Sequence, residues 1–156
     1  MQINGFGTVP TSVPEELHER FMDFWRGYTQ AVGFTSTVDD EDGQGGQLFE
    51  GGGDFDSNYP DAWDDYAPHL TAAERDEMLV DCACFFMEAK DLIDGDDNLA
   101  GSDFHFTRNG HGSGFTDGDW HDCGNELAAM SKPYGSLELY GTLNEHGEIE
   151  SAYLCH

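Results

Sequence analysis

Basic residues are scarce in this sequence. Six Lys and Arg residues stand against 32 Asp and Glu residues, so the formal net charge is −26 at pH 7. A chain with this charge repels the phosphates of nucleic acids and of anionic membranes, whereas basic protein surfaces attract it. The shortage is also local, because no Lys or Arg occurs between Gly27 and Glu74. These features argue against direct binding to nucleic acid and against binding to a membrane.

Long hydrophobic runs are missing as well. No segment has the length and apolar character of a signal peptide or of a membrane-spanning helix. The four cysteines are Cys82, Cys84, Cys123 and Cys155. Because Cys82 and Cys84 lie two residues apart in a predicted helix, their side chains point to different faces and should not form a disulfide. We therefore expect a soluble protein with free thiols in a reducing cytoplasm.

Apolar material is sufficient for a folded protein. The 156 residues are 38% hydrophobic and 13% aromatic, too much for a wholly disordered chain, which predicts a single domain over residues 1–156. A compact domain of this length is roughly 40 Å across. Duplex DNA carries one charge per ~1.7 Å of axis. A stretch of duplex with 26 phosphates, which match the net charge of this chain in number, is therefore roughly 44 Å long. The protein thus has about the charge of a DNA segment of its own length.

Three helices of ordinary length are predicted from apolar residues at helical spacing. They cover residues 14–32, the segment from Thr71 to Gly95, and residues 122–131. The middle helix has the clearest signals, because "TAAE" at its start is a capping box and Gly95 ends it. Residues 35–69 are rich in Asp and Gly, so we expect an acidic, loop-rich insert there, with one short helix around 60–67.

Beyond residue 102 the spacing of apolar residues changes to two, which predicts strands. "DFHFT" (103–107) and "SGFT" (113–116) flank "RNGHG", and Asn-Gly is a strong hairpin signal because both residues tolerate positive φ. "SLELYGTL" (136–143) and "EIESAYL" (148–154) flank "NEHG" in the same way. The predicted fold class is α+β, with about three helices packed on a small antiparallel sheet of two hairpins.

The stretch around the first predicted hairpin resembles a known family. "DFHFTRNGHGSGFTD", followed by a short helix and "YGSLELY", is similar to a largely uncharacterised family of small acidic proteins encoded by bacteriophages and mobile elements. Its members carry DFxxTRNGHGxGFxD and a G-S-[VL]-[DE]-L-Y strand, and the similarity covers about residues 71–150. The resemblance implies a phage or mobile-element origin and no particular activity. This chain departs from the family in its acidic insert and in His105, where members usually have an apolar residue.

Carboxylates gather in the insert and along the middle helix. Five of them, named here the acidic stripe, cover a sector about 100° wide with no cation among them. Like charges at this spacing cost helix stability, which raises the question of their use. They supply about one charge per 5 Å of helix axis, a lower density than that of DNA, so the acids of the insert or the second protomer of a homodimer must supply the remainder. The stripe is Glu74, Glu77, Asp81, Glu88 and Asp91. With the insert, the candidate partner-binding residues are Asp39, Asp40, Glu41, Asp42, Asp54, Asp56, Asp61, Asp64, Asp65 and the five stripe residues.

This pattern predicts a DNA mimic. Carboxylates pair with the Arg and Lys side chains that would otherwise hold phosphates, often bidentately with Arg, and opposite charges speed the encounter. We expect a phage-encoded inhibitor that occupies the basic nucleic-acid-binding site of a host defence protein, either a CRISPR effector or a restriction enzyme. It would act in the host cytoplasm, without a cofactor and without enzymatic activity.

Three alternatives compete with this interpretation. His105, His111 and His121 would suit a small metal-binding protein or a hydrolase, although no nucleophile motif accompanies them. A salt-adapted structural domain would also explain the charge, although the aromatic residues, the cysteines and the local concentration of acid argue against it. Two metal motifs fail on spacing. A zinc set lacks the usual C-x2-4-C spacing, and "DGDDNLAGSDFH" (94–105) departs from an EF-hand loop at its sixth and twelfth positions. The zinc set would be Cys82, Cys84, His121 and Cys123.

Overall fold

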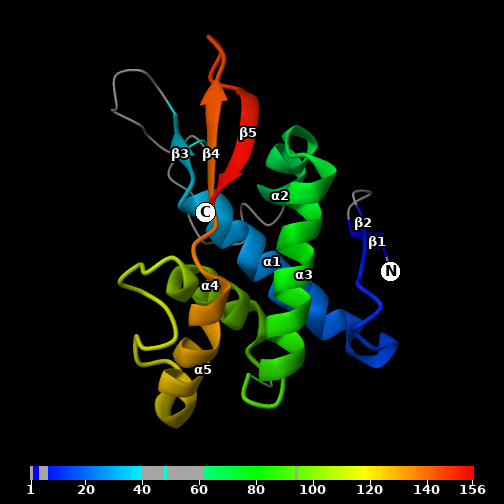
Figure 1. The fold of residues 1–156 in the computed structure, drawn as a ribbon, viewed down its shortest axis with the longest axis vertical. Helices are drawn as coiled ribbons and strands as arrows, with labels where there is room; N and C mark the ends of the chain where they lie inside the picture. The colour runs from blue at the N-terminus through cyan, green and yellow to red at the C-terminus, as the bar shows by residue number, and fades with distance from the viewer. Residues whose placement is uncertain (1, 4–6, 40–47, 49–61, 94) are drawn as a thin grey trace.

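The computed structural model describes residues 2–3, 7–39, 48, 62–93 and 95–156, and within them the chain is α+β (Figure 1). The α-helices in this part are α1 (His18–Phe34), α2 (Ala62–Tyr66), α3 (Ala72–Ala89), α4 (Asp97–Arg108) and α5 (Gly124–Ser131). The 3-10 turns are η1 (Glu15–Leu17), η2 (Ala67–His69), η3 (His121–Cys123) and η4 (Lys132–Tyr134). The strands are β1 (Gln2–Ile3), β2 (Gly7–Thr8), β3 (Thr37–Val38), β4 (Glu138–Leu143) and β5 (Ile149–Cys155). The predicted class is confirmed, but the described helices outnumber the three that were predicted.

The main sheet has three strands and is mixed. β4 and β5 form the antiparallel hairpin that "NEHG" predicted, with Gly147 at φ 78° in its turn. β3 pairs with β4 in parallel, and β1 and β2 form a separate two-stranded sheet near the N-terminus. The prediction of an antiparallel sheet made of two hairpins was therefore wrong, because the first of those hairpins does not exist.

Residues 103–107 belong to α4 instead of to a strand, and residues 113–116 form no strand either. Asn109 and Gly110 end α4 in a Schellman motif. The Gly110 N–H donates to the Thr107 carbonyl (3.2 Å), the His111 N–H donates to the Phe106 carbonyl (3.0 Å), and Gly110 has φ 72°. The positive φ that the Asn-Gly pair tolerates thus terminates a helix here. A hairpin turn and a helix C-terminus both need a residue with positive φ, so the Asn-Gly pair could not distinguish them.

The packing of α4 on α1 explains why this segment is helical. A Cβ atom on Gly27 of α1 would lie 1.9 Å from the carbonyl oxygen of Asn98, and one on Gly101 of α4 would lie 1.9 Å from that of Phe24. The two backbones therefore touch, which only glycine allows at these two places. Ser102 adds a hydrogen bond from its hydroxyl to the Gly27 carbonyl (3.0 Å). These contacts between α1 and α4 outweigh the spacing of apolar residues at every second position, which by itself favours a strand.

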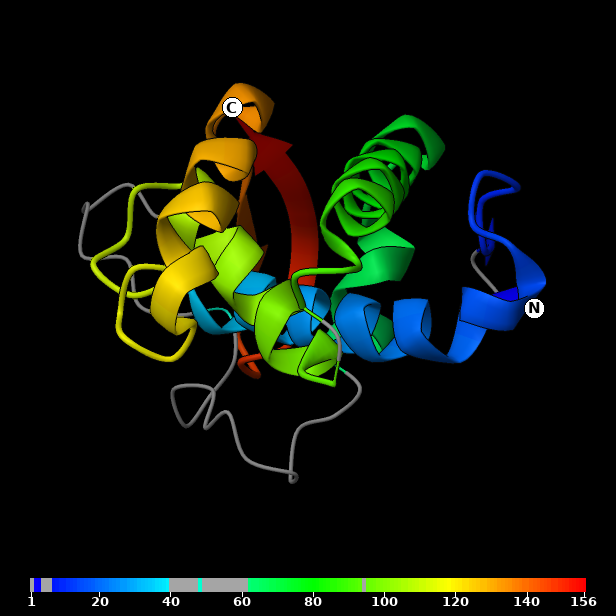
Figure 2. The same ribbon diagram turned by 90° about the horizontal axis from the view of Figure 1, so that it is seen from below.

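Aromatic rings fill the core between α1, α3 and α4. Phe85 of α3 stacks on Phe104 of α4 with ring centroids 4.2 Å apart, and Phe24 of α1 packs beside both. All three side chains are fully buried. Burial of each stabilises the fold by about 1.5–3 kcal/mol. Figures 1 and 2 show α1 running across the molecule with α3 and α4 against it.

α3 begins as the sequence predicts. The Thr71 hydroxyl accepts a hydrogen bond from the Glu74 N–H (3.1 Å), and the Glu74 carboxylate accepts one from the Thr71 N–H (3.0 Å). This reciprocal pair is the predicted capping box. The short helix expected around 60–67 is present as α2, and the one expected over 122–131 is present as η3 and α5.

Candidate functional site

The surface of the described residues carries many carboxylates and few cations. All six Lys and Arg residues lie in the described part, and only Arg26 and Lys132 are exposed. Eighteen Asp and Glu residues are exposed in the same part: Glu15, Glu16, Glu19, Asp23, Asp39, Asp64, Asp65, Asp76, Glu88, Asp91, Asp96, Asp117, Asp119, Asp122, Glu126, Glu145, Glu148 and Glu150. Such a surface repels nucleic acid and attracts basic proteins.

Arg108 shows how the fold uses its few cations internally. Its side chain is 1% exposed and pairs with Asp81 of the acidic stripe (2.8 Å). The same guanidinium donates to the Gly135 carbonyl (2.8 Å), the Tyr134 carbonyl (3.1 Å) and the Tyr28 hydroxyl (3.1 Å). A buried guanidinium requires this many acceptors, because each unpaired donor would carry a desolvation cost.

Two further arginines also face inward. Arg20 of α1 pairs with Asp97 at the start of α4 (2.9 Å) and donates to the Lys90 carbonyl at the end of α3 (2.8 Å). It thereby joins three helices. Arg75 donates to the carbonyls of Leu70 (2.6 Å) and Ala67 (3.3 Å), which holds η2 against α3. The positive charges therefore stabilise the interior and the helix junctions and contribute little to the outer surface.

The predicted residues of the insert are described only in part. Asp40, Glu41, Asp42, Asp54, Asp56 and Asp61 lie outside the described residues. Asp39 follows β3, where its N–H donates to the Gly141 carbonyl (2.7 Å) and its carboxylate accepts a hydrogen bond from the Tyr153 hydroxyl. Asp64 and Asp65 are exposed on α2.

The acidic stripe divides into two halves, and Asp91 lies beyond the end of α3 at Ala89, earlier than the predicted end at Gly95. In the N-terminal half, Glu74 accepts a hydrogen bond from the Leu154 N–H (2.7 Å), Glu77 contacts the His156 imidazole (2.6 Å), and Asp81 pairs with Arg108. Burial acts against ionisation of Glu74, but the hydrogen bonds from Leu154 and Thr71 hold its pKa below the usual range. In the C-terminal half, Glu88 and Asp91 are exposed. The partners of the first half come from α4 and from the end of the chain, so helix spacing could not reveal them.

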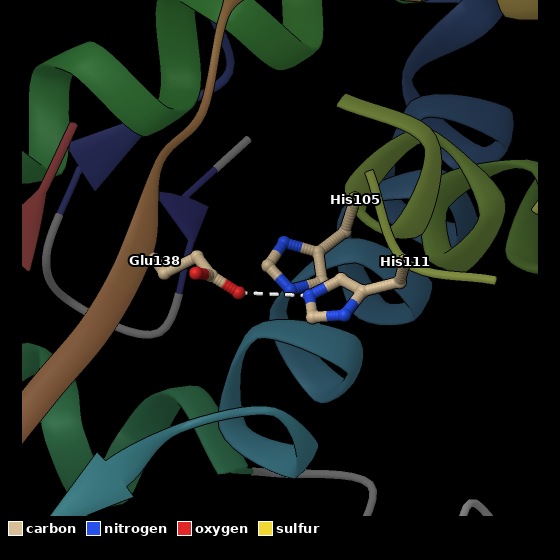
Figure 3. A group of neighbouring side chains, drawn as sticks. All are labelled: His105, His111 and Glu138. Carbon is tan, nitrogen blue, oxygen red and sulfur yellow. Dashed lines mark hydrogen bonds and ion pairs between the residues drawn. The ribbon is translucent and has the colours of Figure 1, made fainter. Parts of the chain in front are cut away.

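Two of the three candidate histidines come together. His105 of α4 and His111 of the following loop point toward Glu138 of β4, and the His111 Nε2 and a Glu138 oxygen are 2.8 Å apart (Figure 3). Within the described part of the chain, this is the one group of three whose ligand atoms lie close enough to hold a metal ion, all within 4.8 Å of one another. His121 lies in η3 and is not part of the group. No sequence spacing pointed to Glu138, which the fold brings in from the sheet.

The hydrogen bonds around His105 place its proton on Nε2. The Leu137 N–H donates to the Asn109 side-chain oxygen (2.7 Å), so the Asn109 amide nitrogen faces His105 Nδ1 (3.2 Å). Nδ1 therefore accepts, and Nε2 donates to the Thr35 hydroxyl (2.6 Å), whose proton goes to the Ala31 carbonyl (3.0 Å). Burial lowers the pKa of His105 to about 3, so the ring is neutral near pH 7.

This tautomer opposes a metal site at the histidine group. A metal bound at the edge facing Glu138 needs an unprotonated Nε2 and a proton on Nδ1 that is donated to an acceptor. Asn109 presents a donor at that position, and turning its amide would remove the acceptor of the Leu137 N–H. The group instead ties the loop after α4 to the start of β4, which is a structural role.

The other two metal sets are not assembled either. Cys82 is fully buried while Cys84 is exposed, so these two thiols face different surroundings, as their spacing predicted. Within the EF-hand match (94–105), residues 97–105 are helical in α4, and Asp97 pairs with Arg20. A calcium loop requires these residues to form an open turn with oxygen ligands directed inward.

None of the helices in the described part of the chain combines the length and the apolar character that crossing a bilayer requires. Comparisons with protein-family models, with curated proteins and with solved structures find no match to this chain. Its function therefore has to be argued from its own residues.

Proposed function

We propose that this protein is a DNA mimic that inhibits a host defence protein, a CRISPR effector or a restriction enzyme, by occupying its basic nucleic-acid-binding site. The observation that supports the proposal most directly is the separation of charge. Arg20, Arg75 and Arg108 donate to groups of the fold, while among the described residues eighteen exposed carboxylates accompany only two exposed cations. Exposed carboxylates pair with Arg and Lys as phosphates do, and their attraction to a basic site accelerates association.

Two adjoining helices supply a surface denser in charge than α3 alone. Arg20 connects α1 to the end of α3 and to the start of α4. Exposed acids occur on all three sides of this junction, and we call them the junction acids: Glu16, Glu19, Asp23, Glu88, Asp91 and Asp96. A single helix spaces the stripe about three times more widely than a duplex spaces its phosphates, so a mimic needs acids from several elements. The acids of the insert, or a second protomer of a homodimer, would extend this surface.

The test begins with the target. The protein, immobilised, should retain a nucleic-acid-binding protein from host lysate and release it in a step to high salt, because exposed charges are screened. In a competition assay against DNA for that target, the double variant Glu88→Gln/Asp91→Asn should compete at least about tenfold less well, a loss of about 1.4 kcal/mol. The matched control is Glu145→Gln/Glu148→Gln at the β4–β5 turn, which removes the same charge elsewhere. Full competition by the first double variant would place the interface away from the junction acids.

The salt-adapted alternative makes the opposite prediction. A mimic is folded at ordinary ionic strength and binds less tightly as salt rises, whereas a salt-adapted domain unfolds near about 0.1 M salt and gains stability well above it. Thermal melts at two salt concentrations separate the two. A melting temperature that climbs by tens of degrees with added salt would support salt adaptation instead of mimicry.

A further inference from the structure

A cavity of about 700 Å³ lies between the C-terminal end of α1, residues 98–106 of α4 and the glycine-rich loop 111–117. Its volume is within the range of roughly 300–1,000 Å³ that small-molecule sites occupy. The loop is held in place, because the Thr107 hydroxyl accepts a hydrogen bond from the Phe115 N–H (3.1 Å) and Gly114, at φ 133°, has no room for a Cβ beside that hydroxyl. The wall is therefore preformed.

Asp103 is one of the residues that line this cavity. The residue is 6% exposed, and its Oδ2 accepts a hydrogen bond from the Trp120 indole N–H (2.6 Å). Its Oδ1 accepts no hydrogen bond from any described residue. Oδ1 is also absent from the fully buried atoms without a partner, so it is not completely enclosed. Because Asp103 lines the cavity, we infer that Oδ1 faces it and can accept a hydrogen bond from a ligand.

Further carboxylates lie near Asp103. Asp117 also lines the cavity, and no Lys or Arg is among the described residues of its lining. Burial raises the pKa of Asp103, and the neighbouring carboxylates of Asp119 and Asp117 add to this effect, against the Trp120 hydrogen bond. A cation bound between Asp103 and Asp117 would relieve this repulsion.

Apolar side chains form another part of the lining. Phe34 of α1 and Phe106 of α4 contribute aromatic rings, and Leu99 lies beside them. Leu99 is 38% exposed and is one of two large hydrophobic residues that are exposed in the described part. Covering such a side chain with apolar ligand surface is favourable.

We propose that this cavity binds a small organic cation: an amidinium, guanidinium or primary ammonium group on a flat apolar body. The cation pairs with Asp103 and Asp117, and the apolar body lies against Phe34, Phe106 and Leu99. The volume is that of a whole ligand and not of one side chain of a partner. This proposal stands independently of the DNA-mimic function.

The experiment compares benzamidine with benzamide, which have the same shape and differ in charge. Binding is followed by NMR titration of the folded protein. Benzamidine should shift the amide resonances of residues 99–117, and benzamide should bind at least tenfold more weakly. Asp103→Asn, Asp117→Asn and Leu99→Ala should each weaken benzamidine binding severalfold. The control, Asp76→Asn, removes the same charge from an exposed site on α3 and should leave it unchanged.

Asp117 and Leu99 are exposed positions, so their variants carry the test even if Asp103→Asn fails to fold. Equal affinity for benzamide and benzamidine would overturn the proposal, since the carboxylates would then play no part. An equal loss in Asp76→Asn and Asp117→Asn would also overturn it, because benzamidine binding would then follow the overall charge of the protein instead of this cavity.

Discussion

The two halves of the acidic stripe present the same type of side chain in different surroundings. In the N-terminal half, Glu74 holds the backbone of β5 and Asp81 neutralises the buried Arg108. In the C-terminal half, Glu88 is exposed and the Asp91 side chain is 90% exposed, beside Lys90 at 3.4 Å. The difference lies in the partners of the carboxylates, since Leu154, His156 and Arg108 contact only the first three of them. In one row of carboxylates, some side chains can thus stabilise the fold while others remain exposed to solvent.

Removing Arg108 should break this comparison most strongly. Arg108→Met leaves Asp81 and three other acceptors without their donor, and we expect a loss of about 3–5 kcal/mol of unfolding free energy, as for other broken buried pairs. Urea denaturation measures it. Arg26→Met removes an exposed arginine of the same length and should change stability by less than about 0.5 kcal/mol. Similar losses in the two variants would show that the Arg108 contacts contribute little.

Neutralising one carboxylate in each half sharpens the comparison. Asp81→Asn should cost about 2–3 kcal/mol, because it removes the charge partner of a buried guanidinium while the side chain is itself 22% exposed. On sequence alone, relief of repulsion along the stripe predicts a small gain instead. Glu88→Gln should show that small gain or no change. Urea denaturation of both variants decides, and a gain in Asp81→Asn would favour the repulsion argument.

His105 is a buried titratable group that is neutral near pH 7, in contrast to the charged pair of Asp81 and Arg108. Its pKa of about 3 lies below the usual value of 6.5, so the unfolded chain binds a proton first as pH falls. Stability should therefore decrease below about pH 6.5 by up to ~1.4 kcal/mol per pH unit. His105→Gln should remove this slope between pH 7 and 5.5, while His146→Gln, at the exposed β4–β5 turn, should retain it. The same slope in both variants would rule out His105 as its source.

Glu74 tests the contact between α3 and β5. Glu74→Gln retains a capping residue but replaces one of the two accepting oxygens with an amide nitrogen, and we expect a loss of about 1 kcal/mol. Because the pKa of Glu74 is lowered, its contribution is present above its usual pKa and disappears as pH falls through the lowered value. Denaturation below pH 5 should show a flatter acid dependence than in Asp76→Asn, an exposed neighbour in the same helix. Parallel pH curves would contradict this.

Glu88 and Asp91 should have the smallest effect on stability. The double variant Glu88→Gln/Asp91→Asn should unfold within about 0.5 kcal/mol of the original protein. Thermal denaturation checks this result before any loss of target binding is interpreted. A large destabilisation would mean that the C-terminal half of the acidic stripe also supports the fold, and that the two halves do not differ as described.

The sequence predicted parts of the candidate site and not others. The excess of exposed acid followed from composition, because the interior has few acceptable places for so many carboxylates. The partners of Glu74 and Asp81 could not be predicted, since they lie 80 and 27 residues away along the chain. The cavity was equally hidden, because its walls come from α1, α4 and a loop that was expected to be the tip of a hairpin.

By itself, the sequence determined the elements whose hydrogen bonds are local. The capping box of α3, the helical spacing in α1 and the β4–β5 hairpin depend on residues within a few positions of one another. The tertiary structure alone decided that residues 103–108 are helical, because the backbones of α1 and α4 approach closely at Gly27 and Gly101 and this packing stabilises a helix. It also decided which carboxylates face inward, because burial of Arg108 requires a counter-charge that only the folded chain brings into reach.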